Sequence, residues 1–182
     1  MTAANMLGRV PERTTMTGLL RVRQLANALN GSTVVGLLLA ALSRTPIEPG
    51  PDGLLLGTDY RPKLPLAGAF TVGNVIFYRA GRPFIDSRPD LLRHEAAHAT
   101  QYAWCLGLPF LPLYAGCAAY SLWRTGDPGS RNFFERNAGL ADGGYRELPT
   151  IHRMPAFRNF LRTVTLSKAT GTTSARKGPT HE

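Results

Sequence analysis

The sequence predicts an α+β fold that is mainly helical. Apolar residues recur at three- and four-residue spacings over 88–106, the pattern of an amphipathic helix. Two other stretches, 25–42 and 113–123, are rich in leucine and alanine and are also expected to be helical. Two short apolar runs bounded by turn residues, 53–57 and 70–78, predict strands. We therefore expect helices packed beside a small β-sheet or hairpin.

Length and composition predict one folded domain with flexible ends. The chain has 182 residues, of which 43% are hydrophobic and 18% charged, enough for a sizeable core. Residues 1–16 are expected to be a flexible N-terminus, without the apolar core of a secretory signal. The domain is expected to span 17–166 and to close with a helix over 151–161. Polar and basic residues dominate 167–182, which predicts a disordered basic tail.

The first apolar stretch allows two interpretations. Residues 25–42 end in an apolar run that is too short to cross a bilayer. We expect this stretch to be a buried core helix. The alternative is attachment to a membrane surface through residues 19–42. Three flanking arginines, Arg21, Arg23 and Arg44, would suit that alternative.

The segment that follows has the features of loops and strands. Proline and glycine are frequent over 45–53, which predicts a loop. Residues 70–78 are the better of the two predicted strands, because β-branched and aromatic residues dominate them. Gly73 followed by Asn74 indicates either a bulge or a tight hairpin turn within this run.

The boundaries of the helix at 88–106 also follow from the sequence. Asp86 or Ser87 can act as its N-cap. Pro89 suits the first helical position, where its missing N–H has little effect. Gly107, two residues before a proline, predicts the end of the helix.

The middle of this helix carries the motif His94-Glu95-Ala96-Ala97-His98. Histidines at i and i+4 lie on one face of a helix, so both imidazoles can bind one metal ion, and they suit Zn²⁺. Glu95 would lie beside a metal-bound water, where a general base is needed. The alternative is that His94 and His98 are core side chains bonded to backbone carbonyls.

A catalytic zinc needs a third protein ligand, and Glu135 is the strongest candidate. It lies within 131–140, which we expect to be a short helix with Ser130 as its cap. Its aromatic neighbours favour an interior position, where metal coordination would offset the cost of burying a carboxylate. Alternatively, Glu135 pairs with a neighbouring arginine on a solvated face, and Asp142 or His152 completes the site.

With these motifs the chain resembles the gluzincin branch of the zincin metallopeptidases, over about residues 70–146. It is also similar to small bacterial proteins with a longer signature. The matching segments are His94 to Gln101 (HEAAHATQ), Leu111 to Tyr114 (LPLY), Asn132 to Ala138 (NFFERNA) and Gly143 to Tyr145 (GGY).

The resemblance implies a zincin-like fold in which the metal helix lies beside a small sheet, whose edge can hold an extended peptide. It implies zinc bound by His94, His98 and Glu135, with Glu95 as general base. Many gluzincins place an aspartate four residues after the ligand glutamate, where it orients a histidine. Gly139 occupies that position here, and Asp142 is the nearest carboxylate.

The sequence therefore predicts a zinc-dependent hydrolase, most consistent with a metallopeptidase. Zinc lowers the pKa of its bound water to about 7, and Glu95 would take the proton and pass it to the leaving amine. Tyr145 and His152, ahead of Tyr114, are candidate donors to the developing oxyanion. The alternative is a non-catalytic zinc-binding structural or interaction protein, with or without membrane-surface attachment.

Composition also bears on partners. The net charge of +9 would suit nucleic acid or anionic lipid, but no nucleic-acid-binding motif is present, so a basic surface with a solvated tail is the simpler explanation. The resemblance to metallopeptidases implies a peptide or protein substrate. Cys105 and Cys117 lack CxxC spacing and are expected to be buried free thiols, with an interhelical disulfide as the alternative. Free thiols favour a reducing compartment and therefore a cytoplasmic location.

Overall fold

The computed structural model describes residues 18–151, and these form an α+β fold, as the sequence predicts. The expectations for 1–16 and for the tail 167–182 concern segments outside this range, as does all but Ile151 of the predicted helix over 151–161. In chain order the elements are α1 (Gly18–Leu29), α2 (Ser32–Ser43), β1 (Ile47–Pro49), the 3₁₀ turn η1 (Pro51–Gly53), β2 (Leu55–Gly57), β3 (Ala69–Val72), β4 (Val75–Tyr78), α3 (Arg82–Asp86), α4 (Pro89–Trp104), α5 (Phe110–Thr125) and α6 (Phe133–Ala138).

The strands form one small mixed sheet in the order β1-β2-β4-β3. β2 and β4 are parallel, whereas the two outer pairings are antiparallel. The predicted strand at 70–78 is in fact a hairpin, because Gly73 and Asn74 form a two-residue turn between β3 and β4, and Gly73 has a φ of 63°. β1 lies within the segment predicted to be a loop. β3 is last in the strand order, so one of its edges is unpaired within the described sheet.

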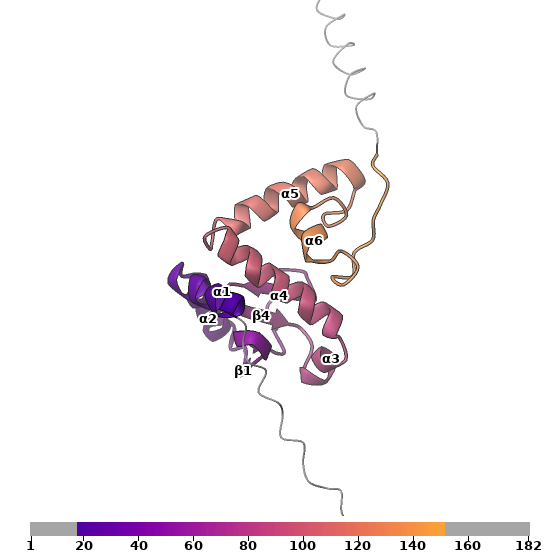
Figure 1. Cartoon of the computed structure of the whole chain (residues 1–182). Coiled ribbons are helices and arrows are strands. Elements are labelled where there is room, and N and C mark those ends of the chain that lie inside the picture. The colour runs from indigo at the N-terminus through magenta and orange to yellow at the C-terminus, as the bar shows by residue number, and fades with distance from the viewer. Residues whose placement is uncertain (1–17, 152–182) are drawn as a thin grey trace, which may run out of the picture.

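Helix α4 crosses the centre of the molecule, with the sheet, α1 and α2 on one side and α5 and α6 on the other (Figure 1). Its side toward the sheet packs Ala99 among buried residues that include Ile76 and Tyr78. On the other side Tyr102 packs with Phe110 and Phe134. α4 therefore belongs to both halves of the core, which holds it firmly.

The ends of α4 differ partly from the prediction. Pro89 does occupy the first turn, and Gly107 follows the end of the helix with a φ of 95°. The N-cap is Arg88, not Asp86 or Ser87, because those two residues terminate the separate short helix α3. The side chain of Ser87 donates a hydrogen bond to the carbonyl of Phe84 instead.

The expectation of one buried core helix over 25–42 is wrong. Two helices, α1 and α2, meet at an angle of 68°. They break at Asn30 and Gly31, because Gly31 has a φ of 80° and the Asn30 side chain binds both the backbone and the hydroxyl of Ser32. Most large apolar side chains of both helices are exposed. No single described helix is long and apolar enough to cross a membrane, although the bent α1–α2 pair passes that test by length and composition.

Two further expectations are corrected around the C-terminal helices. α5 starts at Phe110 rather than 113, and much of its surface is exposed rather than buried. Helix α6 is shorter than 131–140, and its N-cap is Asn132, whose side chain accepts from the Phe134 amide, not Ser130. Cys105 and Cys117 are free thiols, but they are half-buried rather than fully buried.

Candidate metal centre

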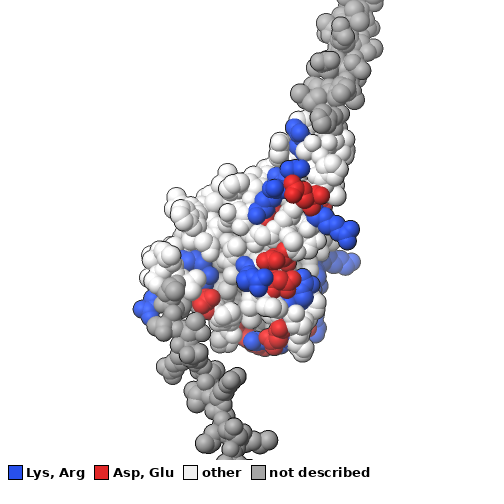
Figure 2. Space-filling model, turned by 45° about the vertical axis from the view of Figure 1, so that its right-hand side comes forward, with Lys and Arg blue, Asp and Glu red and all other residues white. Residues whose placement is uncertain are grey.

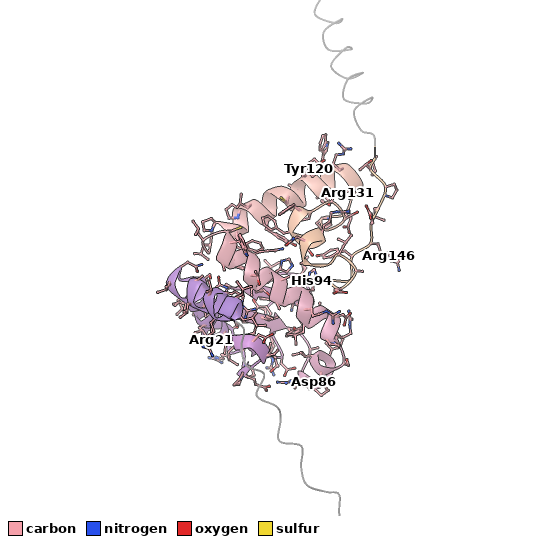
Figure 3. All side chains as sticks on the ribbon, viewed as in Figure 1. Arg21, Asp86, His94, Tyr120, Arg131 and Arg146 are labelled. Atoms are coloured by element: carbon pink, nitrogen blue, oxygen red, sulfur yellow. The ribbon has the colours of Figure 1, made fainter. Side chains whose placement is uncertain are left out.

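The two histidines of the α4 motif lie side by side and face Glu135 of α6, and Figure 3 labels His94 on α4. Both are buried, and their Nε2 atoms are 3.1 Å apart. The rings stand almost perpendicular, at 89°, with centroids 4.7 Å apart. Their helical spacing of four residues produces this pairing, because Ala96 and Ala97 between them point elsewhere and add little bulk. Both Nε2 atoms therefore point to one position.

Glu135 brings its carboxylate to the same position from α6. Its Oε2 is 3.1 Å from Nε2 of His94, and its Oε1 is 3.7 Å from Nε2 of His98. One ligand atom from each of these three residues lies within 4.8 Å of the others. All three side chains are buried, so the solvated pairing of Glu135 with an arginine does not occur. The three residues form a group that can hold a metal ion.

The other ring nitrogens fix the protonation of the two imidazoles. Nδ1 of His94 lies 3.0 Å from the carbonyl oxygen of Gly139, which can only accept, so this nitrogen carries the proton. Nδ1 of His98 lies 2.8 Å from Oε1 of Gln101. In the neutral rings both Nε2 atoms are then lone-pair donors, the form in which histidine binds metal.

Gln101 links the motif helix to α6. Its amide nitrogen donates to the carbonyl of Phe134 at 2.9 Å and to Oδ1 of Asn137 at 3.1 Å. The nitrogen must face these acceptors, so the amide oxygen faces His98 and accepts from its Nδ1. This buried side chain therefore orients His98 and also holds α6, the helix that carries Glu135, against α4.

This group can hold a cation. Two imidazole lone pairs and a carboxylate would otherwise face one another in the interior, without water to stabilise them. Oε2 of Glu135 is fully buried and lies 3.1 Å from Nε2 of His94, a contact that is a hydrogen bond only when this nitrogen carries a proton. A proton or a metal ion at the shared position satisfies all three groups. Two imidazoles and one carboxylate are a ligand set that suits Zn²⁺.

Glu95 lies next to this group and faces the sheet. The hydroxyl of Thr71, on β3, is 2.7 Å from Oε2 of Glu95. Glu95 is buried, and burial raises its pKa to about 7, against the opposing effects of the Thr71 hydrogen bond and the charge of His94. A carboxyl group with this pKa can both accept and release a proton near neutral pH.

The three metal-site residues respond differently to their surroundings. Burial lowers the pKa of His98. Burial also acts to lower the pKa of His94, but the hydrogen bond to Glu135 and the nearby carboxylate charges outweigh it, so that pKa is raised. For Glu135, burial is outweighed by its hydrogen bonds with His94 and Tyr114, which leave its pKa lowered. The shifts of His94 and Glu135 have opposite directions, as expected for a histidine and a carboxylate that each favour the charged form of the other.

Two tyrosines surround the carboxylate of Glu135. The hydroxyl of Tyr114, on α5, donates a short hydrogen bond to Oε1 of Glu135. The side chain of Tyr145 lies close to that of Tyr114. Burial raises the pKa of Tyr145 to about 12, so its hydroxyl is neutral and retains its proton at physiological pH.

A cleft of about 770 Å³ opens beside these residues. His94, His98, Glu95 and Glu135 contribute to its wall, together with β3, whose residues Ala69–Val72 all line it. The remainder is mainly apolar and comes from residues 65–68 and 79–80, from α3, α4 and α5, and from the 143–145 loop. The His-His-Glu group therefore lies in the wall of a cleft that β3 also lines.

The structure brings some of the site residues predicted from the sequence together and leaves others out of the group. It brings together His94, His98, Glu135 and Glu95, and it places Tyr145 in the cleft wall. Asp142 is not in the group, because it lies 3.4 Å from the guanidinium of Arg93. His152 lies outside the described range.

Sequence reasoning did not assign roles to Thr71 or Gly143, which also contribute to the site. The Cα of Gly143 packs so closely on the His94 ring that a Cβ there would lie 2.4 Å from it. Neither contact has a local signal, because each joins segments far apart in the chain. Among the candidate oxyanion donors, the sequence ranked Tyr114 below Tyr145. In the structure, Tyr114 is in direct contact with Glu135.

The fold and the site together define an α+β protein with a buried His-His-Glu group that can hold a metal ion. No protein family, curated protein or solved structure matches this chain.

Proposed function

We propose that this protein is a zinc-dependent hydrolase of the metallopeptidase type, with Glu95 as its general base. The observation that carries the proposal is the convergence of three buried ligand atoms, from His94, His98 and Glu135, within 4.8 Å of one another. A fourth functional group, the carboxyl of Glu95, stands beside them in the same cleft. Three protein ligands facing an accessible cleft are typical of catalytic zinc sites, whereas structural sites are closed by four.

His94, His98 and Glu135 would hold the ion through Nε2, Nε2 and the carboxylate. When bound, zinc supplies an acidified water and a Lewis acid that polarises a carbonyl oxygen. The protein contributes the orientation of the three ligands. Gly139 and Gln101 keep both Nδ1 atoms protonated, and Tyr114 holds one oxygen of Glu135.

Glu95 moves the proton. Thr71 holds its Oε2, and among the described residues Oε1 has no hydrogen-bond partner, so this oxygen is free to act toward the cleft. With a pKa raised to about 7 by burial, the carboxylate accepts a proton from the attacking water and releases it to the leaving amine. This double role needs a group whose pKa lies close to the working pH.

Tyr145 is the group in the described range best suited to stabilise the developing oxyanion. It lines the cleft, and with its pKa raised to about 12 by burial it stays a hydrogen-bond donor.

The cleft favours a peptide with an apolar side chain near the scissile bond. An extended peptide can add to the free edge of β3 by main-chain hydrogen bonds, as in other strand-addition complexes. Phe70, Phe110 and Leu111 contribute apolar walls on the two sides of the cleft. An apolar residue of the substrate would be buried between them.

The test compares the zinc-loaded wild type with Glu95→Gln on a library of fluorogenic peptides that vary around an apolar position. We expect hydrolysis by the wild type and a loss of about 100-fold or more in Glu95→Gln, because general-base catalysis is removed. The variant should retain its zinc. Glu147→Gln serves as a control, since Glu147 is exposed and pairs with Arg131 and Arg136.

Full activity of Glu95→Gln would contradict the mechanism. If the wild type binds zinc tightly but hydrolyses no peptide in the library, the peptidase proposal fails and the metal has the structural role of holding α4 against α6.

A further inference from the structure

Helix α1 has its polar side facing the protein and its apolar side facing outward. Asn27 is fully buried, and its amide donates to Asn74 and to the carbonyl of Ala99. Arg23, one turn earlier, is also buried and donates to the carbonyl of Asp52. The opposite stripe is apolar and exposed: Leu19, Val22, Leu25 and Leu29. This arrangement is the reverse of a helix on the surface of a protein surrounded only by water.

The apolar surface continues across a neighbouring turn. The α1–α2 turn and the α4–α5 turn lie side by side (Figure 1), and Asn30 of the first turn packs against Gly107 of the second. Beside these two residues, Leu29, Trp104 and Leu106 are exposed by 87%, 83% and 79%. We call this surface the apolar tip, formed by Leu25, Leu29, Trp104, Leu106 and Leu108.

Helices α2 and α5 extend the apolar tip on both sides. In α2 the small residues Ser32, Gly36 and Ala40 are buried, and Gly36 packs directly on Val72 and Val75. Most of the large residues of α2 face outward, whereas Leu39 packs against the core. The exposed apolar and aromatic side chains are Val34, Val35, Leu37, Leu38 and Leu42 on α2 and Leu111, Leu113, Tyr120, Leu122 and Trp123 on α5.

The charges around this surface have one sign. No aspartate or glutamate occurs in residues 18–47 or 96–126, which contain the apolar tip and its extensions. Arg21 and Arg44 are exposed at the two outer ends of the α1–α2 pair, and Arg21 is visible at that edge in Figure 3. Carboxylates and their arginine partners gather elsewhere, in the band of charge that Figure 2 shows beside a broad white area. An apolar face with a basic border fits a negatively charged layer.

We infer that the apolar tip docks into the surface of an anionic phospholipid bilayer. The leucines and Trp104 would enter the boundary between headgroups and acyl chains, and Arg21 and Arg44 would lie among the phosphates. Tryptophan and tyrosine are the residues that favour this boundary, since they combine an apolar ring with a polar atom. This inference stands apart from the proposed hydrolase activity.

A second copy of the chain fits this surface less well. A symmetric dimer would place the same border on both sides of the interface, so Arg21 and Arg44 would meet arginines without a carboxylate to pair with. Lipid phosphates supply the missing negative charge. The bend of 68° also favours docking over spanning, because Asn27 and Gly36 tie α1 and α2 to the rest of the fold.

Docking would also orient the cleft. Leu111, in the first turn of α5, follows the apolar tip and lines the cleft that contains the metal group. The mouth of the cleft would then lie close to the membrane surface.

The experiment uses the full-length chain with Trp123→Phe, which leaves Trp104 as the only tryptophan. Vesicles of phosphatidylcholine and phosphatidylserine in equal amounts are added, and tryptophan emission and vesicle flotation are measured. We expect a blue shift of Trp104 and co-flotation, both weaker with pure phosphatidylcholine. In the same background, Leu29→Glu with Leu106→Glu should reduce partitioning by about tenfold or more, because each change removes apolar contact and adds repulsion.

Leu66→Glu is the matched control, since Leu66 is 86% exposed but lies in the loop before β3, away from the apolar tip. It should leave partitioning unchanged. Absence of binding to the anionic vesicles would overturn the inference. The inference would also be overturned if the double variant bound the anionic vesicles as well as the wild type does, because binding would then depend on other, basic residues. The inference would also be overturned if the wild type does not bind vesicles but is a dimer by light scattering, and if the double variant is a monomer. That result would assign the apolar tip to self-association.

Discussion

Nδ1 of His94 lies 3.0 Å from the backbone carbonyl oxygen of Gly139. Gly139 is the fourth residue after Glu135, the position at which gluzincins often carry an aspartate that orients a histidine. Here a main-chain oxygen makes the contact that a carboxylate would make. The same oxygen also accepts from the Gly143 amide at 3.2 Å, which holds it in place. The loop after α6 thus orients a residue of the candidate metal group without an acidic side chain.

We predict that Gly143→Ala weakens zinc binding by about tenfold or more, since outer-sphere changes of this kind usually cost that much affinity. The new methyl group would lie 2.4 Å from the His94 ring and would displace it. Gly68→Ala is the control, because nothing lies within 4 Å of its Cβ position. Affinity is measured by competition with a chromophoric chelator. Equal affinity in both variants would mean that His94 is not held by this loop.

Gln101→Ala should weaken zinc binding by about 10–100-fold, because His98 loses the acceptor that fixes its ring and tautomer. It should also reduce the free energy of unfolding by about 1–3 kcal/mol, since the buried carbonyl of Phe134 loses its donor. Thr100→Ala, one residue earlier, is the control, as that hydroxyl bonds only to the carbonyl of Ala96 in its own helix. Chelator competition and urea unfolding measure the two effects.

Zinc affinity should rise with pH through the neutral range. The hydrogen bond with Glu135 and the nearby carboxylates raise the pKa of His94 despite its burial, so the metal must displace a proton at and below neutral pH. Below the pKa of His94 the affinity should fall by about tenfold for each pH unit. The same chelator assay at several pH values tests this, and an affinity independent of pH would show that His94 is not a ligand.

In the metal-free protein, the pH dependence of folding stability should have the opposite sign to the pH dependence of zinc affinity. A histidine whose folded pKa is raised contributes stability at low pH and loses it as the pH rises through that folded pKa. The raised pKa of His94 should therefore stabilise the metal-free fold on the acid side of neutrality, as long as the pH stays above the lowered pKa of Glu135, its partner. Thermal unfolding of the zinc-free protein and of zinc-free His94→Ala across this range should converge as the pH rises.

Thr71→Val should shift the acidic limb of the pH–activity profile to higher pH. The Thr71 hydroxyl donates to Oε2 of Glu95 and acts to lower its pKa, so its loss leaves burial less opposed. Zinc content should not change, because Thr71 does not touch the metal group. The acid limb is read from kcat/KM between pH 5 and pH 8 (about the range in which groups of this kind titrate). An unshifted limb would mean that Glu95 is not the titrating base.

The helical part of the site could be predicted because its signals are local. The spacing of His94 and His98 places them on one face of any α-helix, whatever its surroundings. Glu135 was more difficult, since its position depends on how α6 packs on α4. Its aromatic neighbours indicated an interior helix face, and the structure buries it there.

The contacts of Thr71 and Gly143 could not be predicted, because they depend on tertiary packing between distant segments. The hairpin at Gly73 was anticipated only as one of two alternatives. The orientation of α1 was wrong for a physical reason. Apolar periodicity shows that a helix has two faces, and the apolar one is normally assumed to face the core. In α1 the polar face is inside, where Asn27 satisfies the carbonyl of Ala99 and the side chain of Asn74.

The most direct test of the central claim is the zinc content of purified protein after incubation with zinc and removal of the excess. Elemental mass spectrometry would compare the wild type with His94→Ala, Glu135→Ala and Glu95→Gln. We predict about one zinc per chain in the wild type and in Glu95→Gln, and almost none in the two ligand variants. A wild type without zinc, or ligand variants that retain it fully, would contradict the account of this site.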